Sequence, residues 1–189
     1  FMAKRIVITG GPGTGKTFLV RELEKAGYQC YHEIIREMTS SVIAEAGTSQ
    51  DLINPLAFVS DPLTFNRNLL QSRLKQFIHA TRSQEPFVFY DRGMPDVLAY
   101  MDYFEQPYSD AFSSPCVESR YDLIFLLPPW KEIYSRDSER FETFEQACEI
   151  HNHLESTYLN FGYSVLTVEM GPVEDRMRYI LNTINAHYG

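Results

Sequence analysis

The chain has 189 residues, 44% of them hydrophobic and 22% charged, a composition typical of one globular domain with a substantial core. Its net charge of −8 argues against nonspecific binding to nucleic acids or anionic membranes, which depends on an excess of Lys and Arg. The three cysteines are scattered, which argues against a disulfide scaffold or a zinc site. Cysteines that do not form a disulfide pattern suggest reduced thiols. The sequence has no apolar run as long as a membrane helix, and its N-terminal segment does not resemble a signal peptide. We therefore expect a cytoplasmic protein.

Five apolar runs predict strands, and they alternate with stretches of helical periodicity. The predicted strands are 4–9, 29–33, 86–91, 121–127 and 164–169. The predicted helices are 18–25, 33–45, 63–82, 95–103, 144–161 and 172–187. Two segments carry weak patterns and are expected to be irregular loops, 47–61 and 105–115. The alternation predicts a single α/β domain over 1–189 with a largely parallel sheet.

A phosphate-binding loop follows the first predicted strand. It reads Gly10-Gly11-Pro12-Gly13-Thr14-Gly15-Lys16-Thr17, which fits G-x-x-x-x-G-K-[ST] at every fixed position, and a helical pattern begins at Phe18. Glycines let backbone N–H groups surround phosphate oxygens, and the helix N-terminus adds partial positive charge. We predict that residues 10–18 bind a nucleotide, that Lys16 reaches its β- and γ-phosphates, and that Thr17 holds Mg²⁺. The alternative is a glycine-rich turn that merely precedes a lysine.

An acidic residue ends the third predicted strand, where a phosphate loop needs a partner for its metal. An apolar run leads into Asp91, and ligands of open α/β sheets bind at the carboxyl ends of the strands. We therefore predict that Asp91 holds Mg²⁺ together with Thr17. Arg92 follows, where motor-type ATPases usually carry a Glu that polarises water; an arginine instead suits an anionic acceptor or a transferring phosphoryl group. The alternative is a strand-end aspartate that caps the turn at 93–95.

Several pieces of the chain together resemble a known group of proteins. They are the loop Gly10–Thr17, Glu33 with Arg36, the phrase from Asp91 to Val97, the phrase from Tyr121 to Pro129, and the segment from Arg136 to Arg140. Asp91-Arg92-Gly93 after an apolar strand resembles the motif of thymidylate kinase and the deoxynucleoside kinases. The wider pattern resembles a family of AAA-labelled P-loop proteins grouped with nicotinamide riboside kinase. This resemblance implies a three-layer P-loop NTPase fold, with helices on both faces of a five-stranded parallel sheet of order 2-3-1-4-5.

The resemblance also gives roles to the residues after the second predicted strand. In the similar deoxynucleoside kinases a carboxylate at the end of that strand acts as general base toward the acceptor hydroxyl, which makes Glu33 the candidate base. Asp91 is its rival. The other interpretation of Glu33 is an acid at a helix N-terminus that interacts with the helix dipole. Arg36 is a candidate clamp for the acceptor.

A lid and an adenine contact are implied in the same way. The similar kinases carry a short arginine-bearing lid at the position of residues 130–142, where Arg136 and Arg140 would stabilise charge on the transferring group. The alternative is an exposed helix whose arginines pair with nearby acids. The backbone of Gly171-Pro172-Val173 corresponds to a segment that touches the adenine ring in related kinases.

One further group of polar residues lies on the predicted helix over 63–82. Arg67, Gln71 and Arg73 are expected on its solvated face, with a place in an acceptor pocket as the less favoured alternative.

These features predict a P-loop phosphotransferase that uses ATP and Mg²⁺ to phosphorylate a small molecule, a nucleoside or a nucleotide. Lys16, Asp91, Arg92, Glu33, Arg136 and Arg140 are its predicted catalytic residues. The alternatives are an ATP- or GTP-hydrolysing switch and a nucleotide-sensing module, each acting through a protein partner. The lack of a Glu after Asp91 argues against efficient hydrolysis. The chain also lacks the extra helical subdomain and the paired Asp-Glu of AAA machines, so we do not expect a mechanical ATPase.

Overall fold

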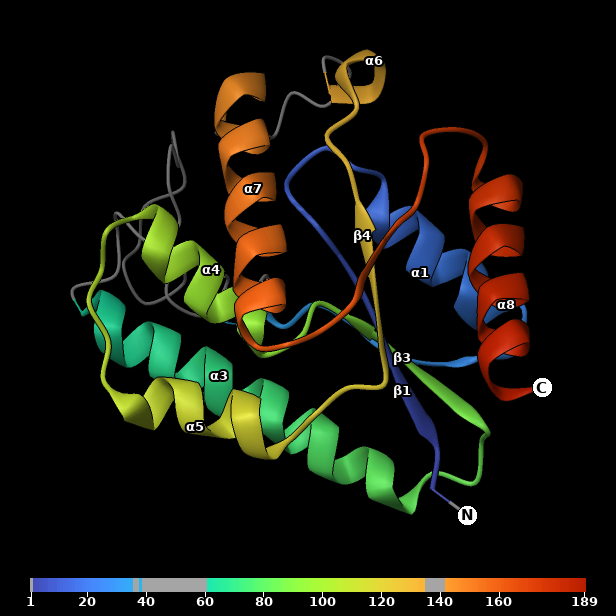
Figure 1. Cartoon of the computed structure of the whole chain (residues 1–189), viewed down its shortest axis with the longest axis horizontal. Helices are drawn as coiled ribbons and strands as arrows, with labels where there is room; N and C mark the ends of the chain where they lie inside the picture. The colour runs from blue at the N-terminus through green and yellow to red at the C-terminus, as the bar shows by residue number, and fades with distance from the viewer. Residues whose placement is uncertain (1, 36–37, 39–60, 135–141) are drawn as a thin grey trace.

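The computed structural model describes residues 2–35, 38, 61–134 and 142–189, and within them five parallel strands form one sheet (Figure 1). The strands are β1 (Lys4–Gly10), β2 (Gln29–Tyr31), β3 (Phe87–Asp91), β4 (Leu123–Leu127) and β5 (Val165–Thr167). Their order is β2-β3-β1-β4-β5, which confirms the predicted α/β fold and strand order. The strand that leads into the phosphate loop therefore lies at the centre of the sheet.

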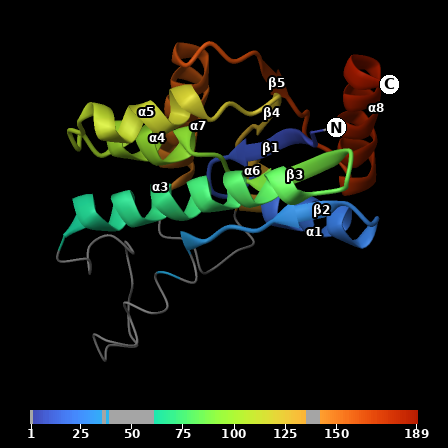
Figure 2. The same ribbon diagram turned by 90° about the horizontal axis from the view of Figure 1, so that it is seen from below.

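Helices cover both faces of the sheet, which gives the three expected layers (Figure 1 and Figure 2). One face is covered by α1 (Lys16–Lys25) and α8 (Val173–Tyr188). The other face carries α3 (Pro62–His79), α4 (Pro95–Tyr103), α5 (Asp110–Glu118) and α7 (Phe144–Asn160). Short helical turns follow α3 and β4, namely η2 (Ala80–Arg82) and α6 (Lys131–Tyr134).

The central strand supplies both apolar cores, because successive side chains of a strand point to opposite faces. Val7 packs with α3, α4, α5 and α7, whereas Ile6 and Ile8 pack with α1 and α8. All three side chains are fully buried, and each burial contributes roughly 2 kcal/mol. A strand buried on both faces reads as a continuous apolar run. The two cores fix the carboxyl ends of the strands, where the phosphate loop and Asp91 lie.

The prediction of an irregular loop over 105–115 is wrong for its second half, where α5 begins at Asp110. Pro115 lies inside this helix, and a proline there removes a backbone hydrogen bond, so the local sequence disfavours a helix. Phe112 and Cys116 lie one turn apart and are buried against the core. Tertiary packing of this pair outweighs the weak local propensity.

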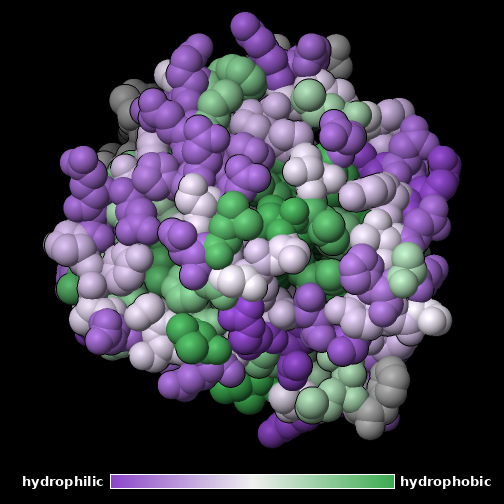
Figure 3. Space-filling model, viewed as in Figure 1, coloured by the Kyte–Doolittle hydropathy of each residue, from purple (hydrophilic) through white to green (hydrophobic). Residues whose placement is uncertain are grey.

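Other predicted elements differ from the structure at their ends. The second strand ends at Tyr31 and the fifth spans Val165–Thr167, both shorter than predicted. The predicted helix over 33–45 and the predicted loop over 47–61 lie almost wholly outside the described residues. None of the described helices is long and apolar enough to cross a membrane. Figure 3 shows hydrophilic residues over most of one face, with apolar side chains gathered near its middle.

Candidate active site

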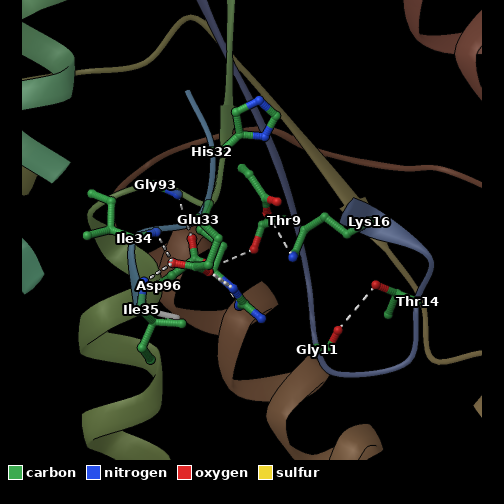
Figure 4. A network of polar contacts seen from close by, with 12 residues as sticks. Thr9, Gly11, Thr14, Lys16, His32, Glu33, Ile34, Ile35, Gly93 and Asp96 are labelled. Carbon is green, nitrogen blue, oxygen red and sulfur yellow. Dashed lines mark hydrogen bonds and ion pairs between the residues drawn. The ribbon is translucent and has the colours of Figure 1, made fainter. Parts of the chain in front are cut away.

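The phosphate loop joins the end of β1 to the N-terminus of α1. Gly15 precedes the helix with a φ of 76°, a left-handed conformation that glycine adopts without strain. No described side chain caps this helix end, so its first backbone N–H groups remain available to an anion. Thr14 donates a hydrogen bond from Oγ1 to the Gly11 carbonyl at 3.2 Å, within the loop (Figure 4). The loop therefore has the amide groups and the closed shape that a chain of phosphates needs.

Lys16 and Asp91 face each other across the end of the sheet. Lys16 is the first residue of α1, and Asp91 is the last residue of β3, which pairs directly with β1. Lys16 Nζ lies 2.8 Å from Asp91 Oδ1, and the two side chains are only 8% and 1% exposed. The structure thus brings together Lys16 and Asp91, which are 75 positions apart in the sequence.

The surroundings of Asp91 fit a divalent cation. Its Oδ1 and Oδ2 are both buried; Oδ1 pairs with Lys16, and Oδ2 has no hydrogen-bond partner among the residues that the structure describes. Thr17 lines the same cavity as Asp91. The described part of the chain holds no cluster of three or more His, Cys, Asp or Glu that could bind a metal by itself. Mg²⁺ keeps waters and phosphate oxygens among its ligands, so one carboxylate and one hydroxyl suffice when a nucleotide is bound.

Glu33 lies just beyond β2 and is paired through both of its carboxylate oxygens. Oε1 accepts hydrogen bonds from the backbone N–H groups of Ile34 (3.1 Å) and Ile35 (3.3 Å) and from Arg73 (2.9 Å). Oε2 lies 2.5 Å from Arg92 Nε. Burial alone raises the pKa of Glu33, but the nearby Arg73 and Arg92 outweigh it and lower the pKa to about 2. Glu33 therefore accepts hydrogen bonds from the backbone N–H groups that follow it, as an acid at a helix N-terminus does. It is also an ionised carboxylate at the candidate site.

Arg92 has a backbone conformation that is rare for a residue other than glycine, with a φ of 77°. Its guanidinium contacts Glu33 and also lies 3.2 Å from Asp96 Oδ1. Tyr100 supports it from a third side, with its ring centroid 5.2 Å from Cζ and its hydroxyl 3.3 Å from a guanidinium nitrogen. Strained backbone persists only where the surroundings fix it, and it concentrates at functional sites.

Asp96 is the buried centre of this network, and the sequence analysis gave it no role. Its carboxylate accepts hydrogen bonds from four donors, Thr9 Oγ1 (2.5 Å), Arg92 (3.2 Å), Gly93 N (3.0 Å) and Tyr158 OH (2.5 Å). It therefore caps the turn after β3, the role that one interpretation assigned to Asp91. The signal for Asp96 was its place in the first turn of a helix that begins with proline. Figure 4 shows Asp96, Glu33 and Lys16 gathered at the carboxyl ends of the strands.

The prediction that Arg73 lies on a solvated helix face is wrong. Its side chain is only 4% exposed. It contacts Glu33 at 2.9 Å and donates a second hydrogen bond to the Gly93 carbonyl at 2.9 Å. Its position was a usable signal, because residue 73 lies four after the buried Leu69 and four before the buried Phe77 on α3. Arg67 and Gln71 are exposed, as predicted.

Cavities lie on both sides of the phosphate loop. On the β2 and β3 side, a cavity of about 140 Å³ is lined by Thr17, Arg21, His32, Glu33 and Asp91. On the β5 side, a cavity of about 180 Å³ is lined by residues that include Glu169, Gly171, Pro172, Asp175, Arg176 and Tyr179. Arg176 is buried and donates a hydrogen bond to the Thr14 carbonyl at 2.7 Å, so it connects the second cavity to the loop.

Some predicted site residues are not brought into the site by the described structure. Arg36, Arg136 and Arg140 lie outside the described residues, so the acceptor clamp and the lid over 130–142 stay predictions. Phe18 is described, and its side chain is 56% exposed on α1.

Comparison with known protein families covers most of the chain, including the residues of the candidate site. A family model described as an AAA domain matches residues 5–176, from β1 to the start of α8. The chain belongs to this AAA domain family. The match includes the phosphate loop, Glu33, Asp91 and Arg92, which carried the resemblance seen in the sequence. A search of curated proteins finds no match.

Three solved structures with a similar fold are the NadR protein, a deoxyadenosine kinase and a thymidylate kinase. The NadR protein in complex with NR is 19% identical, with a TM-score of 0.72 over 98% of this chain and 51% of that chain. The deoxyadenosine kinase from M. mycoides with bound dCTP is 16% identical, with a TM-score of 0.64 over 96% and 99%. The thymidylate kinase from Candida albicans is 12% identical, with a TM-score of 0.62 over 98% and 92%. The chain thus spans about half the length of the NadR protein, and at these identities the likeness shows the fold alone.

Proposed function

We propose that the protein is a P-loop phosphotransferase that moves the γ-phosphoryl group of ATP to a small-molecule acceptor, a nucleoside or a nucleotide. One observation carries the proposal: Thr17, Glu33 and Asp91 line a single cavity beside Lys16. A phosphate loop alone supports nucleotide binding, whereas an ionised carboxylate beyond the metal position supports a second substrate. The fold shared with a thymidylate kinase and a deoxyadenosine kinase adds support by analogy.

On the nucleotide side, the loop amides and Lys16 hold the β- and γ-phosphates, while Thr17 and Asp91 hold Mg²⁺. When bound, Mg²⁺ neutralises charge on the phosphate oxygens. Lys16 exchanges its contact with Asp91 for the phosphate oxygens, and this exchange leaves the Asp91 oxygens for the metal. Because the transferring group is loosely bonded in the transition state, positioning and electrostatic stabilisation supply most of the rate enhancement.

On the acceptor side, Glu33 orients the acceptor hydroxyl through a hydrogen bond to its carboxylate. A carboxylate whose pKa is about 2 is a weak base. It takes the proton only as the hydroxyl oxygen bonds to phosphorus and becomes acidic. Arg92 lies beside Glu33, where its positive charge would offset negative charge that develops during transfer. Asp91 remains the other candidate base.

We place the nucleobase in the cavity of about 180 Å³ on the β5 side. Its lining includes the backbone of Gly171 and Pro172, and Arg176 ties it to the phosphate loop through Thr14. Arg176 Nε is buried and has no hydrogen-bond partner among the described residues, so it is available to an acceptor atom of the base.

The test is phosphoryl transfer from γ-labelled ATP with Mg²⁺ to a panel of nucleosides, nucleoside monophosphates, nicotinamide riboside and phosphoinositides. We expect a labelled product that is lost in Asp91→Asn. Release of free phosphate alone, or turnover that persists in Asp91→Asn, would contradict the proposal. The first outcome would favour a nucleotide-hydrolysing switch.

A further inference from the structure

We propose that the reacting group of the acceptor is an uncharged alcohol, as in a nucleoside, and not the phosphate of a nucleoside monophosphate. This inference rests on the proposed function and assigns the chemical class of the second substrate. Its basis is the pairing of charges around the cavity that contains Glu33 and Asp91.

Two arginines of the described structure lie near this cavity with little exposure, and both are bound by carboxylates. Arg73 contacts Glu33 and the Gly93 carbonyl, and Arg92 contacts Glu33 and Asp96. The four charged side chains are between 1% and 12% exposed. Two positive and two negative charges balance, so this group of side chains offers an incoming ligand no excess positive charge.

An acceptor phosphate would have to break this pairing. If Arg73 or Arg92 turned toward the phosphate, Glu33 would be left as a buried carboxylate with one partner fewer, which is a strongly unfavourable state. The phosphate would also approach the Glu33 carboxylate itself, and like charges repel strongly where water is excluded. The same pair that stabilises ionised Glu33 therefore excludes a second anion.

An uncharged alcohol brings no second negative charge to this group of side chains. Glu33 lines the cavity, and its Oε2 is in contact with Arg92 Nε at 2.5 Å. A carboxylate oxygen has two lone pairs, so an O–H group can donate to Glu33 while the pairing with Arg92 stays in place. In the transfer, the alcohol oxygen bonds to the γ-phosphorus, the bond from that phosphorus to the β–γ bridging oxygen breaks, ADP leaves, and the alcohol proton passes to the carboxylate and then to water.

Among the residues that the structure describes, the other cationic residues that line the cavity are Arg21 and His32, and they do not reverse this preference. Arg21 is exposed on α1, where an ion pair with a phosphate contributes little. His32 lies 3.0 Å from Glu24 Oε1 on the protein surface. Neither residue is buried as Glu33 is, so neither offsets its repulsion of an anion.

The first experiment compares each nucleoside with its own 5′-monophosphate at equal concentrations, with γ-labelled ATP and Mg²⁺. We expect at least one nucleoside to have a kcat/KM at least 100 times that of its monophosphate. If the monophosphate had the higher kcat/KM in every pair that reacts, the inference would be overturned, but the proposed function would stand. Labelled product from neither member of any pair would remove the proposed function, and the inference with it.

The second experiment measures anion binding directly and does not depend on turnover. Inorganic phosphate is titrated calorimetrically into protein saturated with Mg²⁺ and the β,γ-imido analogue of ATP, which occupies the γ-phosphate position. We expect Glu33→Gln to bind phosphate at least 10 times more tightly than the wild type, because Arg73 and Arg92 lose their shared carboxylate. Glu85→Gln makes the same change at an exposed site and is expected to behave like the wild type. Equal phosphate affinity in Glu33→Gln and wild type would overturn the inference, as would a loss of phosphate binding in Arg21→Gln alone.

Discussion

The two sides of the candidate site are built in different ways. On the nucleotide side, eight consecutive residues, Gly10–Thr17, form the loop, and its internal hydrogen bond joins Thr14 to Gly11 only three residues away. On the acceptor side, Glu33, Arg73, Asp96 and Tyr158 come from four separate parts of the chain, and the hydrogen bond from Tyr158 to Asp96 spans 62 residues. The first side is a local motif, whereas the second exists only after the sheet and α3, α4 and α7 have packed together.

This difference predicts two kinds of variant. A change at Thr17 should remove chemistry and leave most of the fold, because this side chain is only partly buried and lines the ligand cavity. Changes on the acceptor side should lower stability and activity together, because each buried charge there is a partner of another. Lys16 and Asp91 form the exception, since their buried contact links the two sides.

The largest expected effect follows from that link. Lys16→Ala should reduce phosphoryl transfer by roughly a thousandfold or more, because a cationic donor to the phosphates is lost. It should also destabilise the ligand-free protein by about 3 kcal/mol, because Asp91 keeps a buried charge without its partner. The double variant Lys16→Ala/Asp91→Asn should recover stability and remain inactive. Urea unfolding and the transfer assay check both parts; a double variant as unstable as the single one would contradict this account.

Arg73 provides the next test, on the acceptor side. Arg73→Met should lower the free energy of unfolding by about 3 kcal/mol, because it leaves Glu33 short of a partner and the Gly93 carbonyl short of a donor. Arg67→Met is the matched control on the same helix, where the side chain is exposed, and should change stability by less than about 0.5 kcal/mol. Equal effects of the two substitutions in urea unfolding would show that the buried network is not what stabilises this side.

The same contrast explains which parts of the structure could be predicted from sequence. Continuous apolar runs predict the central strands and the loop motif predicts the phosphate loop, because each depends on neighbouring residues. The order of the strands was implied only by the resemblance to a known family. The helix at Asp110–Glu118 could not be predicted in this way. Its stability comes from burying Phe112 and Cys116 against distant elements, while Pro115 argues locally against it.

Within the site, the sequence allows the position of single residues to be predicted, but not which residues pair with one another. Asp91 could be placed beside the loop because both occur at strand ends and the family resemblance implied that these strands are neighbours. Arg73 and Asp96 could not be assigned, because nothing near them in the sequence reveals that each faces Glu33 or Arg92. A charged residue within an apolar helical stripe, as at position 73, is the available warning that a buried partner exists.

The pH dependence of stability tests the pairing of Glu33. The pKa of Glu33 falls from its ordinary value of 4.5 to about 2 in the folded protein. Its contribution to stability is therefore complete above pH 4.5 and is lost as the pH falls through about 2; the difference corresponds to roughly 3 kcal/mol. Unfolding free energies between pH 5 and 2 should fall less steeply in Glu33→Gln than in the wild type or the exposed control Glu85→Gln. Parallel curves for all three proteins would contradict the pairing.

The smallest expected effect, at Tyr158, separates the two sides most cleanly. Tyr158→Phe removes one of the four donors to Asp96 and should cost about 1.5 kcal/mol, because the hydrogen bond is buried and ends on a carboxylate. The matched change Tyr108→Phe removes an exposed hydrogen bond to Asp102 and should cost less than about 0.5 kcal/mol. The hydroxyl of Tyr158 donates to Asp96, which in turn accepts from Arg92 on the acceptor side, so kcat should fall severalfold while the KM for ATP stays the same. An equal change in the KM for ATP would show that the two sides are not independent, because the effect would then have passed from the acceptor network into the loop.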